Sequence, residues 1–215
     1  MYKSLIQIGL EKYLNEYFFE RDWLFEKYLE NLDIFVSSKD DSQKCILKNK
    51  FKNNLSHSSL NDHLNELMVA CAFYPKSLFQ KESKGIKSPD IVDFGVEIEI
   101  KTINSDPSEI ERINVLKPNS MRSNLPKDLE YELRICKKFK QRVEKAGEQI
   151  KGKGVVYIVW DSTLVPDWEN RKNIIESLFE KFIELEKNIY PNLTIKTIFF
   201  GDLREVVASQ NRGLV

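Results

Sequence analysis

The sequence has no excess charge of either sign, because 33 Lys and Arg residues balance 33 Asp and Glu residues. A neutral net charge does not indicate a nucleic-acid partner, although a local basic patch would be enough to bind one. Glycine and proline are scarce, at 8 and 7 residues, which argues against a long flexible linker. The length of 215 residues and a hydrophobic content of 41% predict one globular domain with room for an appended subdomain.

Cysteine and histidine are scarce as well. Cys45, Cys71 and Cys136 lie far apart in the sequence, and only His57 and His63 could join them as metal ligands. This spacing excludes the usual structural zinc motifs and predicts free buried thiols in a reducing compartment. The first 20 residues carry several charges and contain no long apolar run. We therefore expect a cytoplasmic protein that has no signal peptide and does not associate with a membrane.

Residues 88–102 predict two short strands joined by a tight turn at Phe94 and Gly95. The second strand alternates apolar and charged residues, in the order Val96, Glu97, Ile98, Glu99, Ile100 and Lys101. Such alternation is typical of a half-buried strand and places the charged residues on one face. The turn would fold Asp90 back beside Glu99, so two carboxylates and a lysine would converge at one end of the hairpin.

These residue types suit a metal-dependent hydrolysis. Carboxylate oxygens are the ligands that Mg²⁺ prefers, and Mg²⁺ keeps several water molecules when bound. A bound metal ion supplies hydroxide near neutral pH and offsets the charge of a phosphate group. Lys101, two residues from Glu99 on the same strand, could orient the attacking water or hold the phosphate.

Pro89-Asp90 followed by Glu99-Ile100-Lys101 resembles the signature of the PD-(D/E)XK nuclease superfamily, which has the restriction-endonuclease-like fold. The resemblance implies metal-dependent hydrolysis of nucleic-acid phosphodiesters. It implies that Asp90, Glu99 and the main-chain carbonyl of Ile100 bind Mg²⁺, with Mn²⁺ as an alternative, and that Lys101 is the catalytic lysine. The signature is short, and an ordinary amphipathic hairpin with solvated charges is the competing interpretation.

The elements around the motif follow the αβββαβ order of that superfamily over residues 59–161. The expected elements are a helix at 59–74, a strand at 77–83, the hairpin, a helix at 135–151 and a strand at 155–160. We therefore predict an α/β fold: a mixed central sheet of about five strands flanked by helices. Residues 1–58 would form an N-terminal helical region, and residues 59–215 the nuclease-like domain.

Outside the motif region, the apolar periodicity predicts a helix over residues 3–32, a helix over 167–188 and a strand over 193–200. Residues 38–57 are polar and basic and are predicted to form a loop. Residues 103–133 are predicted to be irregular, and a polar tail is expected after residue 201.

The resemblance also suggests which helical residues complete the site. The helix before the hairpin often contributes an acidic residue in this superfamily, and Glu66 is the matching candidate; the alternative is a surface carboxylate. The helix after the hairpin often contributes a Gln or Lys, and Gln149 fits this role, with Lys145 as the alternative. His63 lies beside Glu66 and is interpreted as a residue at the core boundary rather than a ligand.

A basic row is predicted along the helix at 135–151. Lys138, Arg142 and Lys145 recur at steps of four and three residues, beside the apolar face of the same helix. Such a row could bind nucleic-acid phosphates, or it could be a lysine-rich face in solvent.

The sequence therefore predicts a Mg²⁺-dependent DNA endonuclease. One alternative is a non-catalytic module on the same fold that binds nucleic acid or protein, and another is a nuclease that cleaves RNA. A homodimer or a partner protein would fit the cleavage of both strands of a duplex by a chain with one site.

Overall fold

The computed structural model describes residues 23–51, 57–81, 88–103, 128–160 and 168–210 of the chain. Its elements, in chain order, are α2 (Trp23–Ser37), α3 (Asp41–Lys50), α4 (His57–Phe73), β1 (Leu78–Phe79), β2 (Ile91–Asp93), β3 (Val96–Ile103), α6 (Asp128–Gln149), β4 (Gly154–Trp160), α7 (Trp168–Ile189), β5 (Leu193–Phe199) and α8 (Phe200–Ser209). No helix in these described ranges is long and apolar enough to span a membrane.

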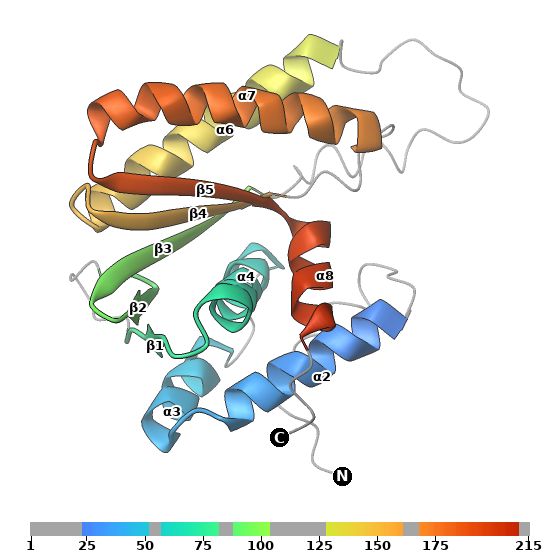
Figure 1. The fold of residues 1–215 in the computed structure, drawn as a ribbon, viewed down its shortest axis with the longest axis vertical. Coiled ribbons are helices and arrows are strands. Elements are labelled where there is room, and N and C mark those ends of the chain that lie inside the picture. Colours follow the sequence, from blue (N-terminus) through green and yellow to red (C-terminus); the bar gives the residue numbers. More distant parts are fainter. Residues whose placement is uncertain (1–22, 52–56, 82–87, 104–127, 161–167, 211–215) are drawn as a thin grey trace. The chain divides into compact units, whose positions relative to one another are not determined.

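Five strands form one mixed sheet in the order β1-β2-β3-β4-β5 (Figure 1). Strands β1, β2 and β3 pair antiparallel, and β4 pairs parallel with β5. Among the residues that the structure describes, the elements from α4 to β4 are, in order, a helix, three strands, a helix and a strand. This arrangement confirms the predicted α/β fold, a mixed sheet flanked by helices. Helices α2 and α3, which precede α4 in the chain, form the predicted N-terminal helical region.

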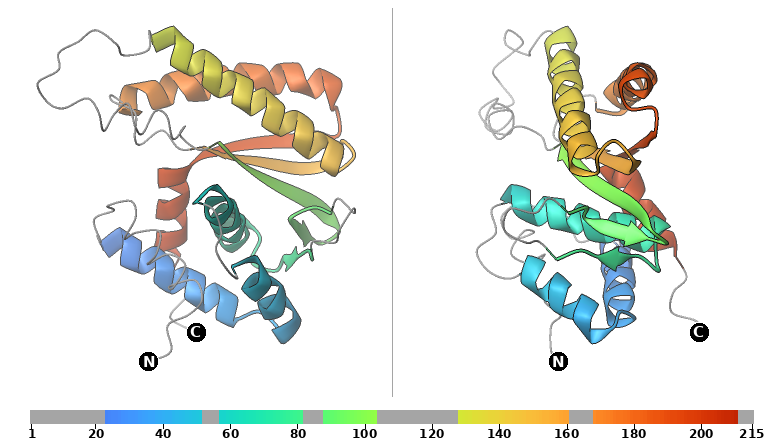
Figure 2. Two further views of the ribbon diagram at one scale, coloured as in Figure 1. Left: turned by 180° about the vertical axis from the view of Figure 1, so that it is seen from behind. Right: turned by 90° about the vertical axis from the view of Figure 1, so that its left-hand side faces the viewer.

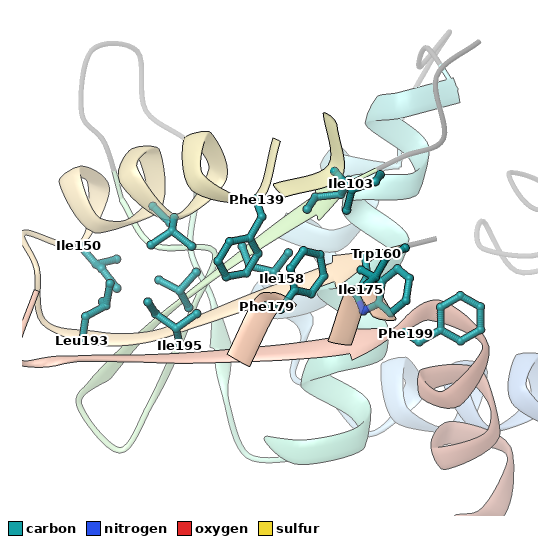
Figure 3. Packing of buried hydrophobic residues seen from close by; sticks show 14 residues of the cluster. Ile103, Phe139, Ile150, Ile158, Trp160, Ile175, Phe179, Leu193, Ile195 and Phe199 are labelled. Atoms are coloured by element: carbon teal, nitrogen blue, oxygen red, sulfur yellow. The ribbon is translucent and has the colours of Figure 1, made fainter. Parts of the chain in front are cut away.

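The chain divides into two compact units, one made of Met1–Ile100 with Phe200–Val215 and the other of Lys101–Phe199. In the second unit, α6 and α7 lie beside each other and pack on β4 and β5 (Figure 2). Phe139 of α6 stacks on Phe179 of α7 with ring centroids 4.5 Å apart, and Phe179 meets Trp160 of β4 edge-on at 5.6 Å (Figure 3). This core confirms that the apolar run of β4 is a buried strand, because Val156 through Trp160 are all buried.

The first unit is organised around α2, α4 and α8, which pack on one another. The Asn31 side chain on α2 donates hydrogen bonds to the carbonyls of Val207 and Ala208, at 2.8 and 3.2 Å. The predicted polar tail after residue 201 is therefore wrong for residues 201–209, which belong to α8. Leu203 and Val207, four residues apart on one helical face, are fully buried, and this burial stabilises the helix.

The predicted loop over residues 38–57 is also wrong, because Asp41–Lys50 form α3. The Asp40 side chain caps this helix by accepting a hydrogen bond from the Gln43 N–H at 2.8 Å. The buried face of α3 consists of Gln43, Leu47 and Lys50, at helical spacing. Two of these three residues are polar, so hydrophobic periodicity did not detect the helix.

Several element ends differ from the predictions. Helix α2 continues to Ser37, beyond the expected end at residue 32, and the predicted helical residues 3–22 lie outside the described ranges. Helix α6 begins at Asp128, so residues 128–133 are helical rather than irregular. Strand β1 is limited to Leu78–Phe79. The cysteines are free as predicted, but Cys45 is exposed, whereas Cys71 and Cys136 are buried.

The β2–β3 hairpin closes with a two-residue loop, because Asp93 pairs with Val96. Both loop residues have positive φ angles, 46° at Phe94 and 82° at Gly95, as a type I′ turn requires. Glycine adopts this conformation freely, but a left-handed conformation costs a residue with a Cβ atom about 1–2 kcal/mol. The hairpin therefore keeps an unfavourable backbone conformation at Phe94.

Candidate functional site

The hairpin places Asp90 and Glu99 opposite each other. Ile91 pairs with Ile98, so the register continues to Asp90 and Glu99 at the next position. The Asp90 N–H donates a hydrogen bond to Glu99 Oε2 at 3.2 Å, and the Ile100 N–H donates one to Asp90 Oδ2 at 2.7 Å. Each carboxylate is thus held by the backbone of the opposite segment, and both lie at the same end of the hairpin, as predicted.

The environment of Glu99 differs from the sequence prediction. The alternation predicted a half-buried strand, and the competing interpretation placed its charged residues in solvent, but Ile98, Glu99 and Ile100 are all buried, and Glu99 is 0% exposed. Glu97, two residues earlier on the same face, is exposed. A buried carboxylate is unfavourable unless hydrogen bonds or a cation compensate its charge. Glu99 is therefore not an ordinary solvated charge of an amphipathic hairpin.

The donor set at the hairpin fits Mg²⁺ better than a metal that needs a complete protein cage. Mg²⁺ is commonly held by one or two carboxylates, with water and substrate phosphate completing its shell. Asp90 and Glu99 supply two carboxylates whose orientation is fixed by backbone hydrogen bonds. Within the described ranges, no group of three or more His, Cys, Asp or Glu side chains could hold a metal ion. A site here would thus rely on the Ile100 carbonyl, water and substrate for its remaining ligands.

Lys101 and Gln149 are brought together in the second unit. Lys101 follows Glu99 by two residues on β3, and its Nζ lies 3.4 Å from Oε1 of Gln149, the last residue of α6. This distance is long for a hydrogen bond, so the contact positions the lysine only weakly. Lys101 and Gln149 are both half-buried, whereas Lys145 is exposed. Of the two predicted helical candidates, Gln149 contacts Lys101.

Glu66 is buried in an ionic cluster rather than exposed on the surface. Its carboxylate lies 2.5 Å from Lys50 Nζ of α3 and 3.3 Å from His63 Nδ1, one turn earlier on α4. Burial alone would raise the pKa of Glu66, but the hydrogen bond from His63 and the charge of Lys50 outweigh it and lower the pKa. Glu66 is therefore ionised at neutral pH.

The sequence analysis gave Lys50 no role in this cluster, and it assigned His63 only a position at the core boundary. Lys50 fell in a predicted loop, yet its side chain is only 7% exposed. The usable signal was the helical spacing of Gln43, Leu47 and Lys50 after a capping aspartate. His63 was interpreted as a residue at the core boundary, and its half-buried side chain agrees with that position. It also contacts the Glu66 carboxylate.

The predicted basic row lies on the described part of α6. Lys138 and Arg142 are half-buried, and Lys145 is exposed. Among the residues that the structure describes, none of these three cations forms an ion pair with an acidic side chain. By contrast, Lys140 on the same helix lies 3.9 Å from Glu144. Three charges of one sign are thus available along one side of α6.

Comparison with known proteins gives no match: no family model, no curated protein and no solved structure matches the chain.

Proposed function

We propose that this protein is a Mg²⁺-dependent nuclease of the PD-(D/E)XK type that hydrolyses phosphodiester bonds, with DNA as its substrate. The observation that carries the proposal is the pair of reciprocal hydrogen bonds between Asp90, Glu99 and the hairpin backbone. It supports the proposal because the same strand continues to Lys101, and because the surrounding elements that the structure describes follow the αβββαβ order. Two carboxylates held in fixed orientations are also the kind of protein ligand set that Mg²⁺ commonly uses.

The proposed roles follow from the position of each group. Asp90, Glu99 and the Ile100 carbonyl would hold the metal ion, which when bound makes hydroxide available and offsets phosphate charge. The Asp90 and Ile100 N–H groups keep the two carboxylates oriented. The Lys101 ammonium would donate hydrogen bonds to the attacking water and to a phosphate oxygen, and Gln149 would limit its rotation. Glu66 acts in this scheme through the ionic cluster that fixes α3 on α4.

The basic row of α6 supports nucleic acid as the substrate. Lys138, Arg142 and Lys145 are not compensated by ion pairs among the described residues, and such cations bind phosphates at the expense of counterions. Binding is therefore expected to weaken as the salt concentration rises. The logarithm of the binding constant should fall linearly with the logarithm of the salt concentration, with a slope of roughly one unit for each phosphate contact. This row contains nothing that distinguishes DNA from RNA, so both belong in the test.

The first experiment is a cleavage assay on supercoiled plasmid, linear duplex DNA, single-stranded DNA and total RNA. Each substrate is incubated with Mg²⁺, with Mn²⁺ and with EDTA. We expect metal-dependent cleavage by the wild-type protein and none by Asp90→Asn or Lys101→Ala. Lys196→Ala is the matched control for the lysine, because Lys196 is an exposed lysine on strand β5. Full activity of Lys101→Ala would contradict the proposed mechanism.

A second experiment separates cleavage from binding. Binding of labelled oligonucleotides in EDTA is measured as a function of salt for the wild type and for Lys138→Ala/Arg142→Ala/Lys145→Ala. Lys140→Ala, which removes an ion-paired lysine of the same helix, is the control. We expect the triple variant to bind about 10-fold or more weakly and its salt slope to fall by up to about three units. Salt-dependent binding without cleavage of any substrate would favour a non-catalytic nucleic-acid-binding module.

Two further properties belong to the proposal. A reducing, cytoplasmic location agrees with three free cysteines. One hydrolytic centre per chain cuts one strand at a time, so cleavage of both strands of a duplex would require a homodimer or a partner protein.

A further inference from the structure

The tip of the hairpin presents an aromatic side chain that neither packing nor backbone preference explains. Phe94 is 83% exposed, so its ring gains little from burial. Its φ angle of 46° belongs to the first position of a turn that strongly favours Asn, Asp or Gly. A backbone outlier of this kind points to a role outside the fold itself.

The other exposed apolar residues and the other left-handed non-glycine residue in the described ranges show only one of these two features. Leu185 and Ile189 are 60% and 61% exposed, but both lie on α7, where the backbone places no special demand on the side chain. Lys151 also has a positive φ, 54°, but it follows the end of α6, and helices commonly end in a left-handed residue. Among the described residues, Phe94 alone combines an exposed large apolar side chain with a positive φ angle.

The surroundings of the ring favour a nucleobase over a phosphate. The neighbouring side chains include Asp93 and the exposed Glu97, which are acidic, so a contact at the tip would be made between the ring and a base rather than between a basic side chain and a phosphate. The space around the turn is open, because a Cβ atom added at Gly95 would meet no atom within 4 Å. An aromatic ring in such a position offers a flat apolar surface on which any unpaired base can stack.

The distance from the tip to the carboxylates suits the same ligand. Three residue steps separate the closing pair Asp93–Val96 from the level of Asp90 and Glu99, which corresponds to about 10 Å along a strand. A base and a phosphate of the same unpaired strand can span this distance. We propose that Phe94 is a base-stacking residue that binds an unpaired nucleobase of the strand whose phosphate is held at the carboxylates. The inference rests on the proposed function in taking nucleic acid as the ligand.

The test uses two substitutions with opposite chemistry at one position. Phe94→Asn removes the ring and supplies a residue that the turn prefers, whereas Phe94→Trp keeps a stacking surface. Binding of a fluorescein-labelled single-stranded oligonucleotide, and of the blunt duplex of the same sequence, is measured by anisotropy in EDTA. We expect Phe94→Asn to bind the single strand about 10-fold more weakly, to change duplex binding less than about twofold, and to melt no lower than the wild type. Phe94→Trp should bind the single strand as the wild type does.

A second readout reports stacking directly. An oligonucleotide containing 2-aminopurine loses fluorescence when the base stacks on an aromatic ring, so the wild type should quench it and Phe94→Asn should not. Equal binding of the single strand by the wild type and Phe94→Asn, or no binding by the wild type, would overturn the inference. A lower melting temperature of Phe94→Asn would do the same, since it would show that the turn favours phenylalanine.

These results can be separated from those of the cleavage assay. A protein that binds single strands through Phe94 but cleaves nothing keeps the stacking role and loses the proposed hydrolysis. A protein that cleaves DNA, but whose Phe94→Asn variant binds and quenches like the wild type, keeps the hydrolysis and loses the stacking role.

Discussion

Two sets of carboxylates in the first unit have different hydrogen-bond and charge partners. Glu66 on α4 is ion-paired with Lys50 and contacted by His63, so cationic or hydrogen-bonding side chains from two helices surround it. Asp90 and Glu99 each accept a hydrogen bond from a backbone N–H group of the hairpin. A lysine cancels the charge of a carboxylate, whereas a backbone N–H orients a carboxylate and leaves its formal charge in place.

This difference separates a structural role from a chemical one. The Lys50–Glu66 pair joins α3 to α4 and makes the position of one helix depend on the other. The oriented carboxylates of the hairpin are suited to attract a cation, and this suitability is the basis of the proposed metal site. If the distinction is correct, substitutions in the first group change stability and substitutions in the second change activity.

The largest effect is expected for Glu99→Gln. The amide is nearly isosteric with the carboxylate and can still accept the hydrogen bond from the Asp90 N–H, but it carries no charge. We expect cleavage to fall at least about 10³-fold, while the free energy of unfolding stays within about 1 kcal/mol of the wild type. Plasmid cleavage rates and urea unfolding measure the two quantities.

Glu97→Gln is the matched control, because Glu97 lies on the same strand and face but is exposed. It should retain full activity and full stability. If Glu99→Gln unfolded at a much lower urea concentration than the wild type, the hairpin carboxylate would be structural, and the comparison with Glu66 would fail.

The next largest effect is expected for Lys50→Met, and it concerns stability. Methionine keeps most of the volume of lysine, but it leaves the Glu66 carboxylate buried without its ammonium partner. Breaking a buried ion pair from one side costs about 3–5 kcal/mol, which urea unfolding at neutral pH would reveal. Lys27→Met is the control, since the Lys27–Glu30 pair has side chains 38% and 57% exposed. That variant should lose less than about 0.5 kcal/mol, and equal losses in both variants would contradict the structural role of Lys50.

The pH dependence of the stability loss in Lys50→Met is a smaller effect that tests whether the charge of Glu66 causes this loss. In the wild type the pKa of Glu66 is lowered below the ordinary glutamate value of 4.5, mainly by its hydrogen bond with His63 and the charge of Lys50. Ionised Glu66 therefore contributes stability above pH 4.5, and this contribution is lost as the pH falls through the folded-state pKa. Without Lys50, burial acts with less opposition, and protonation of Glu66 relieves the uncompensated charge. The stability difference between the wild type and Lys50→Met should therefore shrink on going from pH 7 to pH 4. Urea unfolding at both pH values measures it, and a constant difference would show that lost packing, not charge, explains the variant.

The parts of the fold that could be predicted from sequence are those whose buried faces are apolar. The run from Val155 to Trp160 and the stripe of Phe139 and Val143 identified β4 and α6 because burial and hydrophobicity coincide there. Helix α3 was missed because tertiary partners bury its polar residues. The Gln43 side chain accepts a hydrogen bond from the Phe79 N–H at 2.6 Å and lies 3.3 Å from the Phe79 carbonyl, in the way that a neighbouring strand would.

The candidate site shows the same limit. Local spacing was sufficient to place Asp90 opposite Glu99, because a two-residue hairpin loop fixes the register. The burial of Glu99 could not be predicted, since alternation along one strand does not indicate what covers its charged face. The partners of Glu66 could not be predicted either, because Lys50 comes from a separate helix and an ion pair leaves no periodic signal in the sequence.

The smallest effect is expected at a third buried carboxylate, Glu186 on α7, in the second unit. Glu186 is 3% exposed, and its Oε2 has no hydrogen-bond partner among the described residues. Burial raises its pKa, with Glu144 adding to the shift and Lys140 opposing it. A raised folded-state pKa means that folding favours the protonated form, so ionised Glu186 destabilises the protein at neutral pH, and this penalty disappears as the pH falls below the unfolded-state pKa.

Glu186→Gln should therefore raise the free energy of unfolding at pH 7, by about 1 kcal/mol or less. The gain should shrink as the pH falls and vanish well below the unfolded-state pKa, where wild-type Glu186 is protonated in both states. Glu184→Gln, which changes an exposed carboxylate on the same helix, should produce no gain at neutral or acidic pH. Loss of stability in Glu186→Gln at pH 7 would show that its carboxylate is compensated as Glu66 is. Glu186 would then resemble Glu66, whose charge is offset by neighbouring groups, and would no longer be an example of a buried carboxylate that lowers stability.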